Sequence, residues 1–127
     1  LELYLDALTA TGRDNLVLGL HANASVRQVR EAGWRGKILG FLSPTENEDA
    51  FFAAGGDIIR IWESVATAER IGHHVRQGRP VWITTGEHRT GRLVGDHEAQ
   101  ALRRMVADGA TGFLVNDPMG AREALTA

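Results

Sequence analysis

Five short apolar segments, most of them followed by a longer amphipathic one, dominate the sequence of 127 residues. The apolar segments are expected to be strands, and they lie at residues 16–21, 37–42, 57–63, 81–85 and 112–115. Most are spaced by roughly 20–25 residues, which leaves room for one helix between consecutive strands. Strands that are apolar almost throughout are typical of a parallel sheet covered by helices. The alternation therefore predicts an α/β fold made of parallel β/α units.

The amphipathic segments are expected to form helices over residues 1–10, 26–32, 44–54, 68–77, 97–107 and 121–126. Thr67 is suited to cap the helix at 68–77, and Asp96 the helix at 97–107. Asn23 or Ser25 can cap the helix at 26–32. These local signals agree with the strand pattern and fix the order of the elements.

Two architectures fit five parallel units. The first is a partial TIM barrel, formed by the last five strands or so of a (β/α)₈ barrel, with neighbouring strands in the order 1-2-3-4-5. The second is a complete five-stranded doubly wound sheet of flavodoxin type, with an order such as 2-1-3-4-5. No Gly-rich phosphate loop follows the first strand, and the acids and lysine of a phosphoacceptor receiver are missing from the strand ends. The barrel is therefore the favoured prediction.

Composition narrows the classes of partner. Fourteen Lys and Arg residues stand against sixteen Asp and Glu, for a net charge of -2, and no basic stripe is evident. Because nucleic acids bind basic surfaces, we expect no nucleic-acid partner. No apolar run reaches the roughly 18 residues of a membrane span. We therefore expect a soluble protein of unknown compartment, which could be cytoplasmic, periplasmic or secreted, because the absence of Cys does not decide among these.

Polar residues gather where the predicted strands end, which is the active-site edge in both architectures. They are His21, Ser43, Glu63, Thr84, Thr85, Glu87, Asn116 and Asp117. We expect four of these side chains to cluster at one end of the sheet: His21, Glu63, Thr84 and Asn116.

Alternation along the third strand places Arg60 and Trp62 on one face, toward a barrel interior. An Arg there can clamp a phosphate with two hydrogen bonds, or it can form an internal ion pair with Glu63 or Glu87. Trp82 is expected to be a packed core aromatic on the same face as Thr84. Asp117 followed by Pro118 is typical of a helix start, with Asp117 as the cap.

Two segments resemble a known family. They are Pro80-Val81-Trp82-Ile83-Thr84-Thr85-Gly86 and Asp108-Gly109-Ala110-Thr111-Gly112-Phe113-Leu114-Val115-Asn116-Asp117-Pro118. Together they resemble the C-terminal end of the glycerophosphodiester phosphodiesterase family, a (β/α)₈ barrel. Thr84 matches the Thr of the family's Trp-Thr-Val-Asn, and Asn116 takes the Asp position of its Thr-Asp-x-Pro. The resemblance implies that residues 1–127 form a single partial domain, the C-terminal portion of such a barrel.

The resemblance also implies an activity for a full-length parent enzyme. That activity is the hydrolysis of glycerophosphodiesters to an alcohol and glycerol 3-phosphate, a reaction of lipid and glycerol metabolism. The family uses two histidines and a divalent cation, Mg²⁺ or Ca²⁺, held by carboxylates. Its His-Arg-Gly, Glu-x-Asp and His-Asp motifs are absent from this sequence, which also begins at Leu1 without an initiator Met. We therefore expect a fragment with no catalytic residue and no metal ligand of its own.

The expected role of the chain is to supply barrel wall and to position the substrate. The substrate-binding residues we assign are Arg60, Trp62, Glu63, Thr84, Asn116 and His21. The expected partners are a small-molecule phosphodiester, and the missing N-terminal half of the barrel or a second copy covering the exposed sheet edges. An alternative is a non-catalytic α/β domain that binds a polyol phosphate or another protein.

Overall fold

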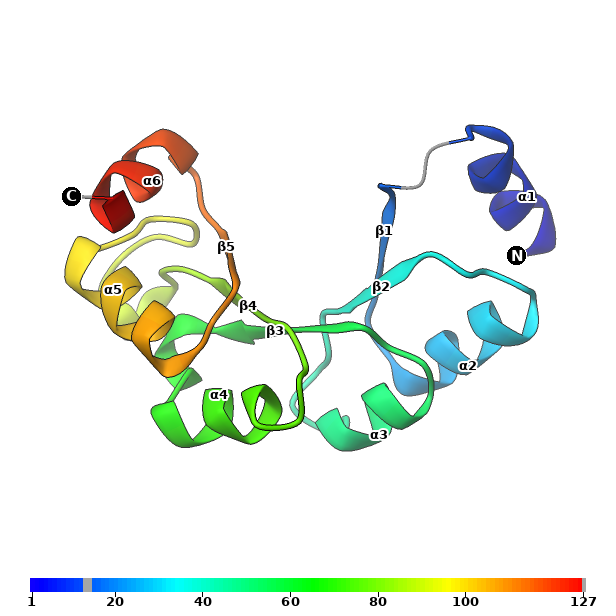
Figure 1. Cartoon of the computed structure of the whole chain (residues 1–127), viewed down its shortest axis with the longest axis horizontal. Helices are drawn as coiled ribbons and strands as arrows, with labels where there is room; N and C mark the ends of the chain where they lie inside the picture. The colour runs from blue at the N-terminus through cyan, green and yellow to red at the C-terminus, as the bar shows by residue number, and fades with distance from the viewer. Residues whose placement is uncertain (13–14, 127) are drawn as a thin grey trace. The chain divides into compact units, whose positions relative to one another are not determined.

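The computed structural model describes residues 1–12 and 15–126, in which strands and helices alternate (Figure 1). The strands are β1 (Val17–Leu20), β2 (Lys37–Gly40), β3 (Ile58–Trp62), β4 (Val81–Thr84) and β5 (Gly112–Leu114). The α-helices are α1 (Glu2–Ala10), α2 (Asn23–Glu31), α3 (Glu48–Ala53), α4 (Ala68–Val75), α5 (Ala99–Asp108) and α6 (Pro118–Thr126). Two 3₁₀ helices, η1 (Glu63–Val65) and η2 (His88–Thr90), follow β3 and β4.

The strands form one parallel sheet in the order β1-β2-β3-β4-β5. This confirms the predicted α/β fold of parallel β/α units. It also confirms the predicted neighbour order 1-2-3-4-5, which a barrel requires, and it differs from the crossed order 2-1-3-4-5. Every expected strand is present, although each is shorter than its apolar run.

The chain divides into two compact units, Leu1–Ile59 and Arg60–Ala127, with the boundary inside β3. The sequence had suggested one partial domain. Each unit has a core of its own, so each is described separately below.

The core of the first unit lies between its strands and the helices α2 and α3, which contact each other. It includes Val26 and Val29 of α2, Ile38 of β2 and Phe51 of α3, all buried. A Cβ on Gly40 would come within 2.8 Å of the Phe51 ring. Glycine at position 40 therefore lets the aromatic ring of α3 pack directly on β2.

Arg30 ties together the backbone that leads into the strands of the first unit. Its guanidinium donates to the carbonyl of Gly55 at 2.9 and 3.0 Å, to that of Trp34 at 2.8 Å and to that of Gly36 at 2.9 Å. It also pairs with Asp57 at 2.8 Å, and Asp57 accepts the backbone N–H of Ile38 at the same distance. Trp34 and Gly36 precede β2, and Gly55 and Asp57 precede β3, so this network stabilises the amino-terminal ends of both strands.

In the second unit, helices cover one face of the strands. On that face, the buried strand residues are Ile61 of β3 and Val81 and Ile83 of β4. The buried helix residues are Ile71 of α4 and Leu102 and Met105 of α5. α4 contacts β4 and α5, and α5 contacts α6. The buried Ile61, Val81 and Ile83 alternate with the half-buried Arg60, Trp62 and Trp82, as the two-residue period of a strand requires.

The opposite face of the second unit, here called the open face, carries Arg60, Trp62, Trp82, Thr84, Gly112 and Leu114. Most of these residues are half-buried. Trp82 lies over its neighbour on β5, since a Cβ on Gly112 would come within 2.6 Å of the indole. Trp82 is thus half-buried and packed against a glycine of the open face, not in the core as the sequence predicted.

Two predicted helix caps are confirmed and two are wrong. Thr67 accepts the backbone N–H of Arg70 at 3.1 Å, and Asp117 accepts that of Gly120 at 2.9 Å. Asn23, by contrast, is the first residue of α2, and its buried side chain donates to the carbonyl of Asn47. Asp96 does not cap α5, because its carbonyl binds Arg92 and the helix begins only at Ala99.

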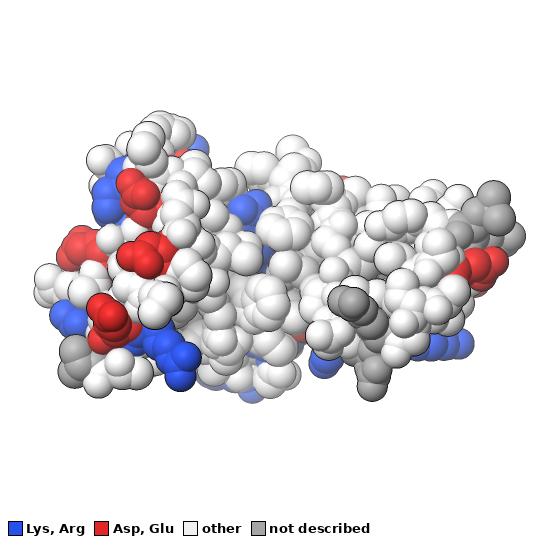
Figure 2. All heavy atoms as spheres, turned by 90° about the horizontal axis from the view of Figure 1, so that it is seen from above, with Lys and Arg blue, Asp and Glu red and all other residues white. Residues whose placement is uncertain are grey.

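The surface carries mixed charge. On the face drawn in Figure 2, Lys and Arg side chains lie among Asp and Glu at one end, and most of the remaining described surface is uncharged. Of the described helices, none has the length and apolar character needed to cross a bilayer. The prediction that the chain does not bind nucleic acid stays a prediction.

Candidate functional site

The candidate site lies in the second unit, where β3 and β4 end. Glu63 is the first residue after β3, and its side chain is only 7% exposed. Its carboxylate accepts the backbone N–H of Gly86, just beyond β4, at 3.1 Å. Both carboxylate oxygens also accept hydrogen bonds from the guanidinium of Arg92. This is a two-point charge-assisted pair, the strongest kind of side-chain hydrogen bonding.

The surroundings of the pair set its ionisation. Burial alone would raise the pKa of Glu63, but the hydrogen bonds from Arg92 and from the Gly86 N–H hold that pKa below its ordinary value. The hydrogen bond to Glu63 likewise raises the pKa of Arg92. Both groups are therefore charged at neutral pH, and the pair is a salt bridge.

A tight loop connects the two partners. Gly86 has φ of +75°, and a Cβ there would meet the carbonyl oxygen of Leu93 at 1.9 Å, so only glycine fits. Glu87 also has a positive φ, +97°, which is rare for a non-glycine residue. It pairs with Arg92 in an antiparallel bridge across the loop. Strained backbone of this kind is often found at functional sites, and the bridge holds it in place here.

Glu87 is the second acid at this edge. The nearby Ser64 hydroxyl, followed by His88 and Arg89, lowers the pKa of Glu87. Nδ1 of His88 lies 3.4 Å from Oε2 of Glu87, and the His88 side chain is 83% exposed. The loop thus exposes an imidazole beside a carboxylate whose own side chain is only 14% exposed.

Arg60 and Trp62 share the open face, as the sequence predicted. The guanidinium carbon of Arg60 lies 4.2 Å from the centroid of the Trp62 ring, a cation–π distance. Nη1 of Arg60 donates to Oγ1 of Thr84 at 3.1 Å. Burial lowers the pKa of Arg60, but a guanidinium ordinarily loses its proton only far above neutral pH, so the group stays protonated. The guanidinium therefore contacts both an indole ring and a hydroxyl.

Asn116 follows β5, where the sequence placed it, but its side chain is committed to the loop. Its Nδ2 donates to the carbonyl of Val94 at 2.9 Å, and its backbone N–H donates to that of Gly95 at the same distance. The Asn116 amide therefore fastens the segment before α5 to the end of β5. Its predicted contact with substrate stays a prediction.

His21 belongs to the first unit. Its Nδ1 lies 3.2 Å from the carbonyl oxygen of Phe41, and its ring packs at 5.9 Å from the Phe41 ring. The prediction that it joins Glu63, Thr84 and Asn116 extends across the two units and stays a prediction.

The sequence analysis did not single out Arg92, and it did not predict the strained backbone at Glu87. Glu63, one of the two carboxylates considered as a partner for Arg60, pairs with Arg92, which is 29 positions further along the chain. The signal that could have found them is the charged segment bounded by Gly86 and Gly91, because paired glycines around charges mark a constrained loop.

The two acids at this edge do not suit a divalent cation. A cation site needs carboxylate oxygens directed at one point and free of competing positive charge. Glu63 is held by a guanidinium, and Glu87 lies beside His88 and Arg89. The expectation that the metal ligands of a parent enzyme lie outside this chain stays a prediction.

Comparison with protein-family models, with curated proteins and with solved structures finds no match for this chain. The resemblance to the glycerophosphodiester phosphodiesterases thus stays a prediction, and the geometry above is what can support or oppose it.

Proposed function

We propose that this chain is part of a glycerophosphodiester phosphodiesterase-like barrel and that its second unit binds the glycerol phosphate end of the substrate. The consecutive strand order supports this proposal because a barrel needs it. The observation that carries it is the Arg60 guanidinium on the open face, oriented by Trp62 and Thr84. A guanidinium matches the geometry of a phosphate through paired hydrogen bonds.

The proposal divides the work between this chain and the rest of the barrel. Arg60 would bind phosphate oxygens, and Trp62 would limit the orientations open to the guanidinium and so lower the cost of binding. Glu63 would act through the pair with Arg92, which fixes the ends of β3 and β4. Proton transfer and the divalent cation would come from the family's His-Arg-Gly, Glu-x-Asp and His-Asp segments, which this sequence does not contain.

Binding of glycerol 3-phosphate to the purified chain tests the proposal. Isothermal titration should show saturable binding, and Arg60→Ala should weaken it by about tenfold, the loss of one charge-assisted contact. Arg60→Lys keeps the charge but not the paired geometry, so it should fall between the two. Equal binding of glycerol, or an unchanged affinity in Arg60→Ala, would remove the phosphate role.

Activity provides the second test. The chain alone, with Mg²⁺ or Ca²⁺, should show no turnover of glycerophosphocholine above background. Addition of an N-terminal half-barrel that carries the missing motifs should create turnover, and Arg60→Ala in this chain should reduce it. If the chain binds glycerol 3-phosphate but complementation never yields turnover, the alternative of a non-catalytic polyol-phosphate-binding domain is correct.

A further inference from the structure

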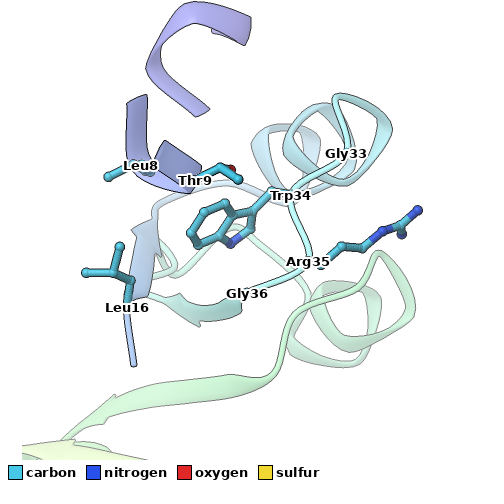
Figure 3. A pocket seen from close by; sticks show the side chains of 7 residues that line it. All are labelled: Leu8, Thr9, Leu16, Gly33, Trp34, Arg35 and Gly36. Atoms are coloured by element: carbon cyan, nitrogen blue, oxygen red, sulfur yellow. The ribbon is translucent and has the colours of Figure 1, made fainter. Parts of the chain in front are cut away.

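The three tryptophans of the chain differ in what their rings contact. Trp34, in the first unit, is 7% exposed, and its ring packs against Gly36 beside a cavity of about 340 Å³ (Figure 3). Trp62, in the second unit, has the guanidinium of Arg60 over its ring. Trp82 is half-buried on the open face of the same unit, and phosphate binding by Arg60 does not use it.

Trp82 lies flat on the neighbouring strand β5. A Cβ on Gly112 would lie 2.6 Å from Cδ1 of the indole, 2.7 Å from Nε1 and 2.9 Å from Cγ. Because these three consecutive ring atoms are almost equally distant, the Cβ would meet the face of the five-membered ring and not its edge. A Cβ on a strand points out of the plane of the sheet. The indole thus has one face on β5 and the other directed away from the sheet.

The outer face of this indole can stack on a further ring. Among the residues that the structure describes, none forms an aromatic pair, a cation–π contact or a hydrogen bond with the Trp82 side chain. Aromatic rings stabilise one another when they stack in an offset arrangement. Trp82 therefore forms a platform, supported by Gly112, for a flat ring that comes from solution.

Arg60 is the only charged residue among the six that form the open face, so the face complements a ligand with one negative group. Its guanidinium donates to Thr84, which lies two residues after Trp82 on β4. Two residues along a strand span about 6.6 Å. A phosphate on Arg60 and a ring on Trp82 can therefore belong to one small molecule.

The remaining open-face residues favour an aromatic ring over a sugar or polyol ring. Apart from Arg60 and the two indoles, the face carries the hydroxyl of Thr84 together with Gly112 and Leu114. A ring covered with hydroxyl groups would find few hydrogen-bond partners here, whereas a nucleobase stacks through its faces. One cation also suits one phosphate, and not the row of phosphates in a nucleic-acid strand. These features point to a mononucleotide.

We propose that the open face binds a nucleoside monophosphate, with the base stacked on the outer face of Trp82 and the phosphate held by Arg60. The phosphate contact rests on the proposed function, whereas the stacking rests on the position of Trp82 over Gly112. In a full barrel, the nucleoside would be the alcohol esterified to the glycerol phosphate. The open face would then select the substrate by its base.

Three probes separate the base from the phosphate: AMP, ribose 5-phosphate, which lacks the base, and adenosine, which lacks the phosphate. Isothermal titration of the purified chain should show tighter binding of AMP than of either other probe. In proton spectra, the H2 and H8 signals of AMP should move upfield on binding, because these protons enter the ring current of an indole. The upfield shifts should be absent with Trp82→Leu.

Variants of the platform test its role. Trp82→Leu removes the ring, so the affinity for AMP should fall roughly fivefold to a hundredfold, the range for the loss of one base–aromatic stack. Its affinity for ribose 5-phosphate should not change, which shows that the variant folds. Trp82→Phe should have an intermediate affinity for AMP, and Gly112→Ala should weaken AMP because the added Cβ displaces the indole. The control is Tyr4→Leu, which removes an exposed aromatic side chain from α1 and should bind AMP as the wild type does.

The inference is overturned if AMP binds no more tightly than ribose 5-phosphate, or if Trp82→Leu binds AMP as tightly as the wild type. In either case the phosphate role of Arg60 stands if ribose 5-phosphate binds and Arg60→Ala weakens it. If adenosine binds as tightly as AMP, Arg60 does not hold the phosphate, and both this inference and the proposed function are wrong. The absence of binding by all three probes would also refute both.

Discussion

The buried pair of Glu63 and Arg92 makes a quantitative prediction about the stability of the second unit. The change is Glu63→Gln, which keeps the shape of the side chain and removes its charge. The amide can still accept one hydrogen bond, but the two-point contact with the guanidinium is lost. The Arg92 side chain, which is only 23% exposed, then has no counter-charge from Glu63.

The expected loss follows from these contacts. Removing one partner of a buried ion pair costs roughly 3–5 kcal/mol. Arg92 is partly solvated and also donates to the carbonyl of Asp96, so the lower end applies. We expect Glu63→Gln to lower the free energy of unfolding by about 3 kcal/mol. Replacing both partners, as in Glu63→Leu with Arg92→Met, should cost less than either single change, because no unpaired charge stays behind.

The assay is urea unfolding at pH 7, followed by tryptophan fluorescence in a Trp34→Phe background. In that background Trp62 and Trp82 report on the second unit alone. The control variant is Asp108→Asn, which breaks the exposed pair with Arg104 and should cost less than about 0.5 kcal/mol. The reasoning fails if the midpoint of Glu63→Gln matches that of Asp108→Asn. It also fails if the double variant loses the sum of the two single losses.

Three further predictions follow from the same contacts. Because the folded pKa of Glu63 is lowered, the stability that Glu63 contributes is fully present above its unfolded pKa of about 4.3 and is lost as the pH falls through the folded pKa. At pH values below about 4, the urea concentration at the unfolding midpoint of the wild type should therefore decrease, and it should decrease less in Glu63→Gln. A lysine at position 30 cannot reach three carbonyls and Asp57 together, so Arg30→Lys should lower the free energy of unfolding of the first unit by about 1–3 kcal/mol, and Asp57→Asn should lower it less. Trp34 fluorescence in a background that lacks the other tryptophans measures both losses. Gly112→Val should displace Trp82, cost about 1–3 kcal/mol and shift the emission of that indole, and an unchanged spectrum would contradict the packing described.

Local periodicity was enough to predict the elements, their order and which side chains share a strand face. Arg60 and Trp62 illustrate this, because alternation in an extended chain has no other outcome. The same rule could not locate Arg92, since its contact with Glu63 depends on how the loop after β4 turns back. Nor does any propensity predict a positive φ at Glu87, where glutamate is disfavoured and the loop geometry prevails.

Helix starts failed for a related reason. Asn23 has a good capping side chain, yet it is drawn into the first unit and donates to the carbonyl of Asn47, 24 positions away. Asp96 is likewise held by Arg92 through its backbone. A cap is a local preference of about 1 kcal/mol, so another hydrogen bond of similar strength can override it. Thr67 and Asp117 keep their caps because no such competing contact engages their side chains among the described residues.

The two arginine networks lie at opposite ends of their strands, and this separation has a physical consequence. Arg30 binds backbone that precedes β2 and β3, whereas Arg92 binds a carboxylate that follows β3. In parallel β/α folds the carboxyl-terminal ends carry the ligand site, and the amino-terminal ends serve stability. Arg92 lies at the carboxyl-terminal edge of the strands, where its charge is neutralised by Glu63, whereas Arg60 of the open face is the residue proposed above to bind phosphate. The charge that stabilises the second unit and the charge proposed to bind phosphate are therefore carried by different residues, so substitutions can change one property without the other.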